Sequence, residues 1–73
     1  RMDLNDTDIT NLQNYLQKKF GNPGLTIRKR RVADSVEVYL NGEAIGTIYK
    51  DNDEGEVSYD FNMSNLDIDL EEA

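Results

Sequence analysis

The chain contains neither cysteine nor histidine among its 73 residues. Without cysteine it has no disulfide and no thiolate metal ligand. Without histidine it lacks the commonest general base near neutral pH and the commonest zinc ligand. A nucleophile paired with a histidine base is therefore excluded within one chain. We expect no metal, no other cofactor and no enzymatic activity.

Long apolar stretches and an excess of positive charge are also missing. No run approaches the roughly 20 apolar residues that span a membrane, and the first residues form no hydrophobic signal region, so we expect a cytoplasmic location without membrane contact. Fifteen acids against eight bases give a formal net charge of −7, which makes nucleic acid an unfavourable partner. The distribution is uneven, because residues 51–73 hold nine acids and no base.

A helix is predicted over residues 6–20. Asn5 is a suitable N-cap, and Asp8 stands three residues later as the acid of a capping box. Gly21 suits a left-handed C-cap, and Pro23 prevents the helix from resuming. The apolar stripe of this helix consists of Ile9, Leu12, Leu16 and Phe20.

After the helix the apolar period changes from 3.6 to 2, which predicts strands. The dipeptide of Asn41 and Gly42 indicates a tight hairpin, because both of its turn positions need positive φ. Ile45 and Ile48 cannot both face inward in a regular strand, so we expect a β-bulge at Gly46. The predicted strands span residues 25–31, 35–40, 43–49 and 56–63.

These elements predict an α+β fold, with an N-terminal helix packed on a four-stranded antiparallel meander in one domain over residues 1–73. The acidic tail, residues 64–73, is ambiguous. Leu66, Ile68 and Leu70 alternate as in a strand, whereas Met63, Leu66 and Leu70 fit one face of a helix. Tyr59 is expected in the core.

Half of the positive charge lies in one run, Arg28, Lys29, Arg30 and Arg31. In a strand, Arg28 and Arg30 share one face, so the run does not form one continuous basic patch. Glu37 on the neighbouring strand belongs to the same open face, which predicts a cross-strand pair with an arginine. Tyr39 also lies on this face, and tyrosine is a common anchor for protein partners. Arg28, Arg30, Glu37 and Tyr39 are therefore the candidate partner surface.

Two functional hypotheses follow from these patterns. The first is a small non-enzymatic protein-interaction module, whose partner is another protein or a second copy of the chain. The alternative is a nucleic-acid-associated protein that uses the basic run at residues 28–31. The acidic run at residues 51–56 does not match a calcium loop, because its glycine falls at position 5 and Asn62 takes the place of the required glutamate, so it is interpreted as a polar turn.

Two stretches of the chain also carry a family resemblance. The first is Asn-Leu-Gln-Asn-Tyr-Leu-Gln-Lys-Lys-Phe-Gly-Asn at residues 11–22. The second is Val-Glu-Val-Tyr-Leu-Asn-Gly-Glu at residues 36–43, continued by residues 59–63 and 66–70. With these stretches the chain resembles a family of short bacterial proteins of unknown function, chiefly alphaproteobacterial. The resemblance covers nearly the whole chain and implies no substrate, cofactor or catalytic residue.

Overall fold

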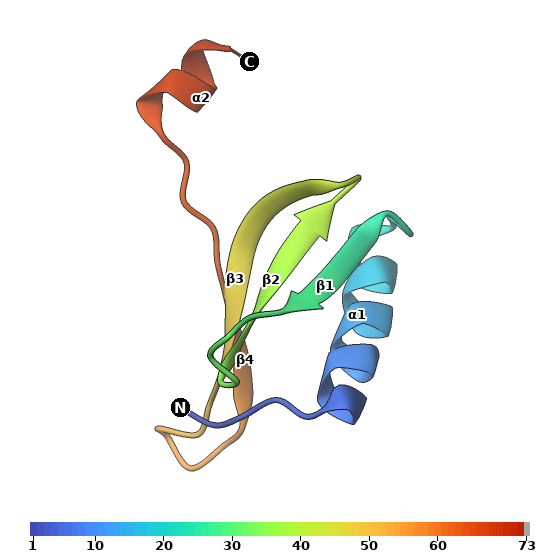
Figure 1. Ribbon diagram of the computed structural model, residues 1–73, viewed down its shortest axis with the longest axis vertical. Helices are drawn as coiled ribbons and strands as arrows, with labels where there is room; N and C mark the ends of the chain where they lie inside the picture. The colour runs from blue at the N-terminus through green and yellow to red at the C-terminus, as the bar shows by residue number, and fades with distance from the viewer. Residues whose placement is uncertain (73) are drawn as a thin grey trace.

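A computed structural model describes residues 1–72, which form two helices and one four-stranded sheet (Figure 1). In chain order the elements are α1 (Asp6–Phe20), β1 (Leu25–Lys29), β2 (Ser35–Leu40), β3 (Glu43–Asp51), β4 (Ser58–Asn62) and α2 (Asp67–Glu71). The strands lie in the order β1-β2-β3-β4, and every neighbouring pair is antiparallel. The predicted α+β class and four-stranded meander are confirmed. Neither helix in the described part of the chain has the length and apolar character needed to cross a membrane.

Helix α1 has the bounds that its capping residues predict. The Asp8 backbone N–H donates to the Asn5 side chain at 2.7 Å, and the Asn5 N–H donates to the Asp8 carboxylate at 3.1 Å. This reciprocal pair satisfies two N–H groups that have no partner within the helix. At the other end, Gly21 takes the left-handed conformation with φ 61°.

Four predicted strand boundaries, in three strands, differ from the structure. β1 ends at Lys29 rather than at residue 31, and β4 covers only Ser58–Asn62 rather than residues 56–63, because its ladder with β3 begins at the pair of Ser58 and Asp51. β3 continues to Asp51, beyond the predicted residue 49. The reason is that Lys50 has backbone partners outside the meander: its N–H donates to the Asp34 carbonyl and its carbonyl accepts from Met2.

The predicted β-bulge is present in β3. Val38 lies opposite Gly46, whereas the next residue of β2, Tyr39, lies opposite Ala44. Ile45 is therefore the additional residue, and the strand face shifts by one position at this point. As a result Ile48 is buried, and Ile45 also packs against the core.

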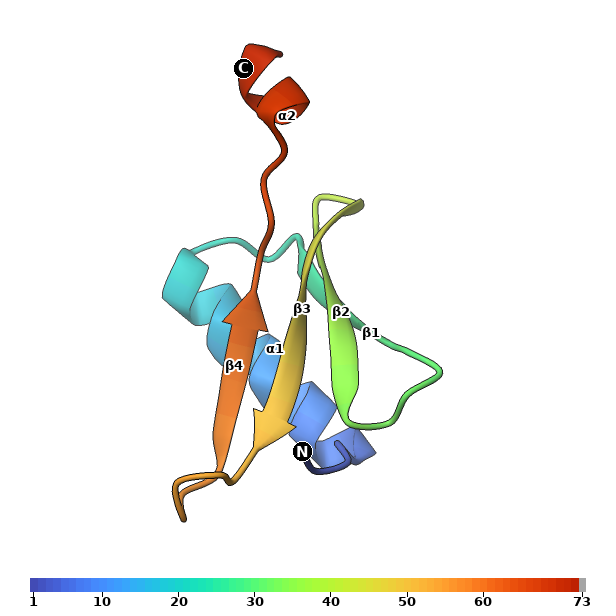
Figure 2. The ribbon, with the colours of Figure 1, turned by 90° about the vertical axis from the view of Figure 1, so that its left-hand side faces the viewer.

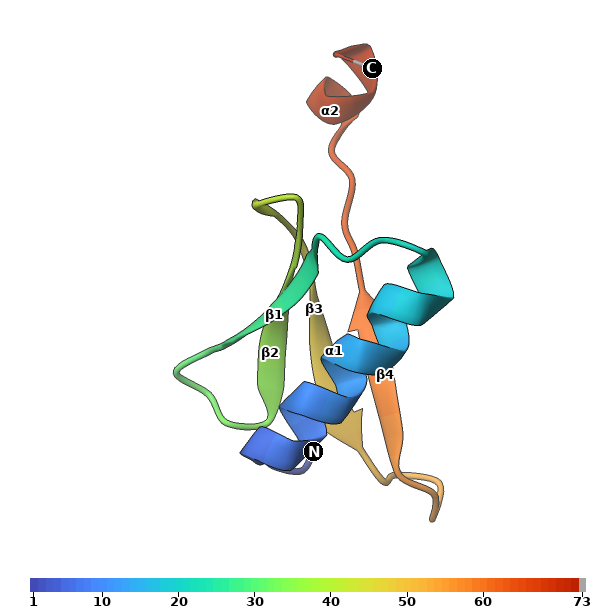
Figure 3. The ribbon, with the colours of Figure 1, turned by 90° about the vertical axis from the view of Figure 1, so that its right-hand side faces the viewer.

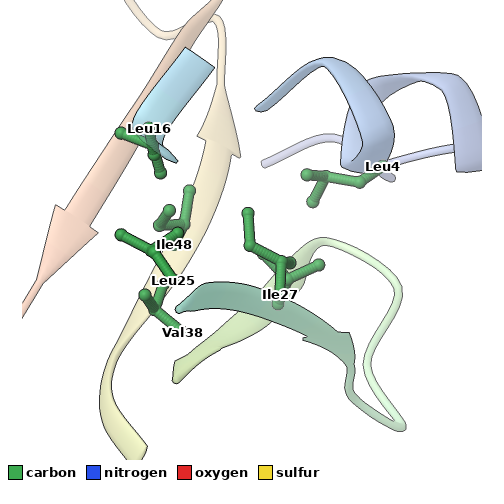
Figure 4. Packing of buried hydrophobic residues seen from close by; sticks show 7 residues of the cluster. Leu4, Leu16, Leu25, Ile27, Val38 and Ile48 are labelled. Atoms are coloured by element: carbon green, nitrogen blue, oxygen red, sulfur yellow. The ribbon is translucent and has the colours of Figure 1, made fainter. Parts of the chain in front are cut away.

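The core lies between α1 and one face of the sheet (Figure 4). Its buried apolar side chains are Leu4, Leu16, Leu25, Ile27, Val36, Val38 and Ile48. The prediction that Tyr59 belongs to this core is wrong, since its side chain is 38% exposed. The physical reason is that β4 is an edge strand and α1 crosses the sheet obliquely. The helix therefore leaves the beginning of β4, where Tyr59 lies, uncovered (Figure 3).

The C-terminal segment extends away from the rest of the chain, in line with β4 (Figure 1). The predicted tail at residues 64–73 contains the five-residue helix α2, so the helical alternative applies to Asp67–Glu71. The Asp69 carboxylate accepts the Leu66 N–H at 3.1 Å and starts this short helix. Ala73, the last residue of the predicted tail, lies outside the described residues.

The two edges of the sheet differ in how their backbone groups are satisfied. At the β1 edge, the Ile27 N–H donates to the Gln13 side chain at 2.8 Å, and the Gln17 side chain donates to the Leu25 carbonyl at 2.9 Å. Gln13 and Gln17 lie one turn apart on α1 and take the place of a neighbouring strand. An edge whose backbone groups are covered in this way pairs less readily with another chain.

We expect Gln13→Ala to lower the free energy of unfolding by about 1 kcal/mol, because it removes the acceptor of the Ile27 N–H. Asn14→Ala is the matched control, since Asn14 is exposed on the same helix and its replacement should stay within about 0.5 kcal/mol. Urea titrations of both variants measure the difference. Equal stabilities for the two variants would show that the glutamine does not support the edge.

Candidate functional site

Three of the four residues of the candidate partner surface meet on the open face of the sheet, which Figure 2 shows with α1 behind it. Arg28 and Glu37 lie directly opposite each other on β1 and β2. The Arg28 guanidinium lies 4.0 Å from the centroid of the Tyr39 ring, and the Tyr39 hydroxyl donates to the Glu37 carboxylate at 3.4 Å. Tyr39 therefore joins the two residues, through a cation–π contact with Arg28 and a hydrogen bond to Glu37.

Two further basic residues of the run, Lys29 and Arg30, have separate partners. Arg30 follows the end of β1 and donates to the hydroxyl of Ser35, which is 2% exposed, at 2.7 Å. Lys29 forms an ion pair with Asp6 at 2.6 Å on the side of the sheet that carries α1. The structure thus divides the basic run between the two faces of the sheet, in agreement with the alternation of a strand. A partner role for the open face stays a prediction.

A groove between α1 and β4 lies on the opposite face of the sheet, and sequence analysis did not identify it. We call it the α1–β4 groove. Its volume is about 380 Å³, and it is open to solvent. Leu16 and Ile48 form its buried floor, with exposed fractions of 7% and 1%. Its walls are Asp8, Asn11, Leu12 and Tyr15 from α1, with Val57, Ser58, Tyr59 and Phe61 from β4 and the preceding turn.

The rim of the α1–β4 groove is aromatic and apolar. Tyr15, Val57 and Tyr59 expose large parts of their side chains to solvent. At the far end of the groove, the rings of Phe20 and Phe61 meet edge to face, with centroids 6.5 Å apart and planes at 88°. Beyond this contact a second apolar hollow of about 310 Å³ follows, lined by Phe20, Asn22, Leu25, Leu40, Ile45, Phe61 and Met63. Apolar surface therefore continues along the whole length of β4.

An ion pair closes the other end of the groove. The Lys50 ammonium lies 2.7 Å from the Asp8 carboxylate, and both side chains are mostly buried, with exposed fractions of 13% and 18%. The Tyr59 hydroxyl donates to the same carboxylate at 3.3 Å. The hydrogen bond from Lys50, supported by the Asn5 backbone N–H, holds the pKa of Asp8 below its ordinary value of 3.8. The same bond raises the pKa of Lys50 above 10.5.

We expect Lys50→Met to destabilise the protein at neutral pH and to raise the pKa of Asp8 towards 3.8. Because the folded-state pKa of Asp8 is lowered, its contribution to stability is present above 3.8 and is lost as the pH falls through the lowered value. The difference in free energy of unfolding between wild type and the Lys50 variant should therefore shrink as the pH falls. Urea titrations over an acidic pH series, with an NMR titration of the Asp8 carboxyl group, measure this.

Lys29→Met provides the matched control for that series. Its ion pair with Asp6 is exposed, with side-chain fractions of 69% and 84%, and exposed pairs contribute little to stability. The difference in free energy of unfolding between wild type and the Lys29 variant should show no comparable change with pH. If both variants respond alike, the pair of Lys50 and Asp8 has no special role in closing the groove.

Among residues 1–72, no strand pairs with the outer edge of β4, which lies next to this groove. The N–H and carbonyl of Lys50 point towards Asp34 and Met2, away from β4. In an antiparallel ladder the pairs alternate, so the residues opposite Lys50 and Ile48 turn their backbone groups outward. These residues are Tyr59 and Phe61. In contrast to β1, β4 therefore presents an open edge.

The acidic side chains do not build a metal site in the described residues. Among residues 1–72, no group of three or more carboxylates is placed to hold an ion. The acidic run at residues 51–56 contributes to the turn between β3 and β4, where the Gly55 N–H donates to the Asn52 carbonyl at 3.0 Å and Gly55 has φ 79°. The interpretation of this run as a polar turn is confirmed.

Comparison with known proteins gives one match. A family model described as a protein of unknown function (DUF3126) matches residues 8–69. The match begins within α1, contains all four strands and ends within α2. No curated protein and no solved structure matched the chain.

Proposed function

The chain belongs to the DUF3126 family, whose function is unknown, and we propose that it is a non-enzymatic protein-interaction module. One observation carries the proposal: a row of large apolar side chains along α1, β4 and the C-terminal segment stays exposed. The row consists of Tyr15, Phe20, Val57, Tyr59, Met63, Leu66, Ile68 and Leu70. Large apolar side chains that stay exposed side by side, as Tyr15, Val57 and Tyr59 do along the α1–β4 groove, are typical of sites that bind another protein.

The chemistry of the α1–β4 groove supports binding of a protein segment. Tyr15 and Tyr59 offer large, rigid contact areas on its rim, and tyrosine is enriched among residues that dominate binding energy. The open edge of β4 supplies backbone donors and acceptors beside the groove, which suits an added strand. The one carboxylate in the groove lining, Asp8, is paired with Lys50, an arrangement that favours a structural role over acid–base catalysis.

The proposal retains two expectations from the sequence, a cytoplasmic location and the absence of catalysis. It also retains the open face around Arg28, Glu37 and Tyr39 as a secondary contact area. The basic run receives less weight, because Lys29 and Arg30 are engaged with Asp6 and Ser35.

A photo-crosslinking amino acid at position 15 tests the proposal in cells. Tyr15 lies on the rim of the groove, whereas the neighbouring Asn14 lines no part of it and serves as the control position. We expect discrete protein adducts from position 15 that are absent from position 14. Identical adduct patterns at the two positions, or adducts that disappear on nuclease treatment, would contradict the proposal, the latter in favour of nucleic acid.

A further inference from the structure

We infer that the partner of this surface is a second copy of the chain, joined through β4 and holding the exchanged C-terminal segment. The inference rests on the proposed function and names its partner. It starts from the contrast between the two edges of the sheet. Gln13 and Gln17 close the β1 edge within the chain, whereas β4 presents an open edge with an apolar face. An open edge of this kind is a template for strand pairing.

The open edge is self-complementary in a register centred on Phe61. Two β4 strands related by a two-fold axis pair antiparallel, and the outward backbone groups of Tyr59 and Phe61 fix which residues exchange hydrogen bonds. A register centred on Asp60 would place two like charges opposite each other, which is unfavourable. A register centred on Phe61 instead places Asp60 opposite the partner's Asn62, and Tyr59 opposite the partner's Met63. This register pairs polar side chains on the open face and apolar side chains on the face of α1.

The position of the C-terminal segment favours the same register. The segment leaves β4 after Asn62, just beyond Phe61 at the far end of its own α1–β4 groove, and continues in line with the strand (Figure 2). An antiparallel partner has its groove at that end. Pairing centred on Phe61 carries residues 63–65 past the partner's Tyr59 and Val57, which line the partner's groove. From there we place the following residues in the partner's groove.

The apolar side chains of the segment need such a site. Leu66 and Leu70 are 64% and 67% exposed, although they lie at or within a helix of only five residues. A helix this short is not stable in water without packing against another surface. We place Leu66 and Leu70 in the partner's groove, against its Tyr15 and Val57. Ile68 lies on the opposite side of α2 and faces solvent in this arrangement.

Disulfide trapping tests the pairing and its register, because the chain contains no cysteine of its own. Residues directly opposite in a non-hydrogen-bonded pair lie about 4.5 Å apart, within the range of a disulfide. Diagonal residues lie about 7–8 Å apart and are too distant. An equal mixture of Asp60→Cys and Asn62→Cys chains should therefore form a covalent heterodimer on mild oxidation. Neither variant alone should form a covalent dimer. Crosslinking of one variant alone would contradict the register.

Light scattering on the purified full chain tests the association itself. We expect twice the monomer mass of 8.4 kDa. Leu66→Glu and Leu70→Glu together should weaken the dimer at least about tenfold, since each removes a buried leucine from the interface. Ile68→Glu changes the charge of the same helix and should weaken it less than about threefold. A strictly monomeric chain at high concentration, or equal effects of all these variants, would overturn the inference.

Failure of this inference is distinguishable from failure of the proposed function. If the purified chain is monomeric but position 15 crosslinks to a different protein in cells, the second copy is the wrong partner and the interaction module stands. If the chain is monomeric and position 15 gives no adduct beyond the control, both proposals fail. Adducts of two chains of this protein at position 15 support both.

Discussion

Replacing Ile48 with alanine should lower the free energy of unfolding by about 3 kcal/mol, because truncation of a buried isoleucine removes apolar contacts and leaves a cavity. Ile48 is 1% exposed and forms the floor of the α1–β4 groove. A chain of 73 residues has a total stability of about 4–11 kcal/mol, so the loss is a large part of it. We expect the midpoint of urea unfolding to fall accordingly. If the wild-type stability is about 4 kcal/mol, a measurable fraction of the variant chains should be unfolded even without urea.

Ile68→Ala is the matched control, since it makes the same chemical change at a site that is 59% exposed. In dilute solution it should change stability by less than about 0.5 kcal/mol. The comparison separates the effect of burial on stability from the effect of shortening an isoleucine side chain. Similar losses in both variants would mean that Ile48 does not lie in the core described above.

Replacing Gly46 with alanine should cost about 2 kcal/mol, the second-largest effect that we expect. A Cβ atom at this position would lie 2.5 Å from the Asn62 carbonyl oxygen and 2.5 Å from the ring of Phe61. The backbone of Asn62 belongs to β4, so β3 and β4 must separate to accommodate the methyl group. Because Phe61 also closes the α1–β4 groove against Phe20, the change should disturb the groove as well as the sheet.

Gly42→Ala separates this steric effect from ordinary backbone strain. Gly42 has φ 85° and nothing within 4 Å of an added Cβ, so its replacement should cost about 1 kcal/mol through left-handed strain alone. Gly46 is not among the residues with positive φ. Urea titrations compare the two stabilities, and NMR spectra should show shifts of Phe61 only in the Gly46 variant. If Gly46→Ala costs less than Gly42→Ala, the close approach of β3 and β4 is wrong.

The contrast between the two sheet edges connects the fold with the proposed function. Side chains of α1 satisfy β1, and the oblique path of the helix leaves β4 and the α1–β4 groove uncovered. The fold therefore disfavours strand pairing at the β1 edge and leaves the β4 edge accessible. In the dimer that we infer, centred on Phe61, the four strands of each copy would join into one continuous sheet, and each C-terminal segment would cover the groove of the other copy.

The sequence by itself determined the features that depend on near neighbours in the chain. The bounds of α1 follow from the cap at Asn5, the apolar spacing and Gly21, all of which act within one or two helical turns. The bulge beside Gly46 follows from strict alternation, because Ile45 and Ile48 can share a face only if one residue is added. The meander follows from the order of short strands and tight turns.

Only the tertiary structure decided how these elements meet. The bond between Gln13 and Ile27 spans 14 residues, and the pair of Asp8 and Lys50 spans 42, so no local pattern identifies either one. The exposure of Tyr59 depends on β4 lying at an edge and on the path of α1 across the sheet. Side-chain packing between the layers sets that path, whereas periodicity fixes only which face of each element is apolar. For this reason the α1–β4 groove, on which the proposed function rests, was not predictable from the sequence.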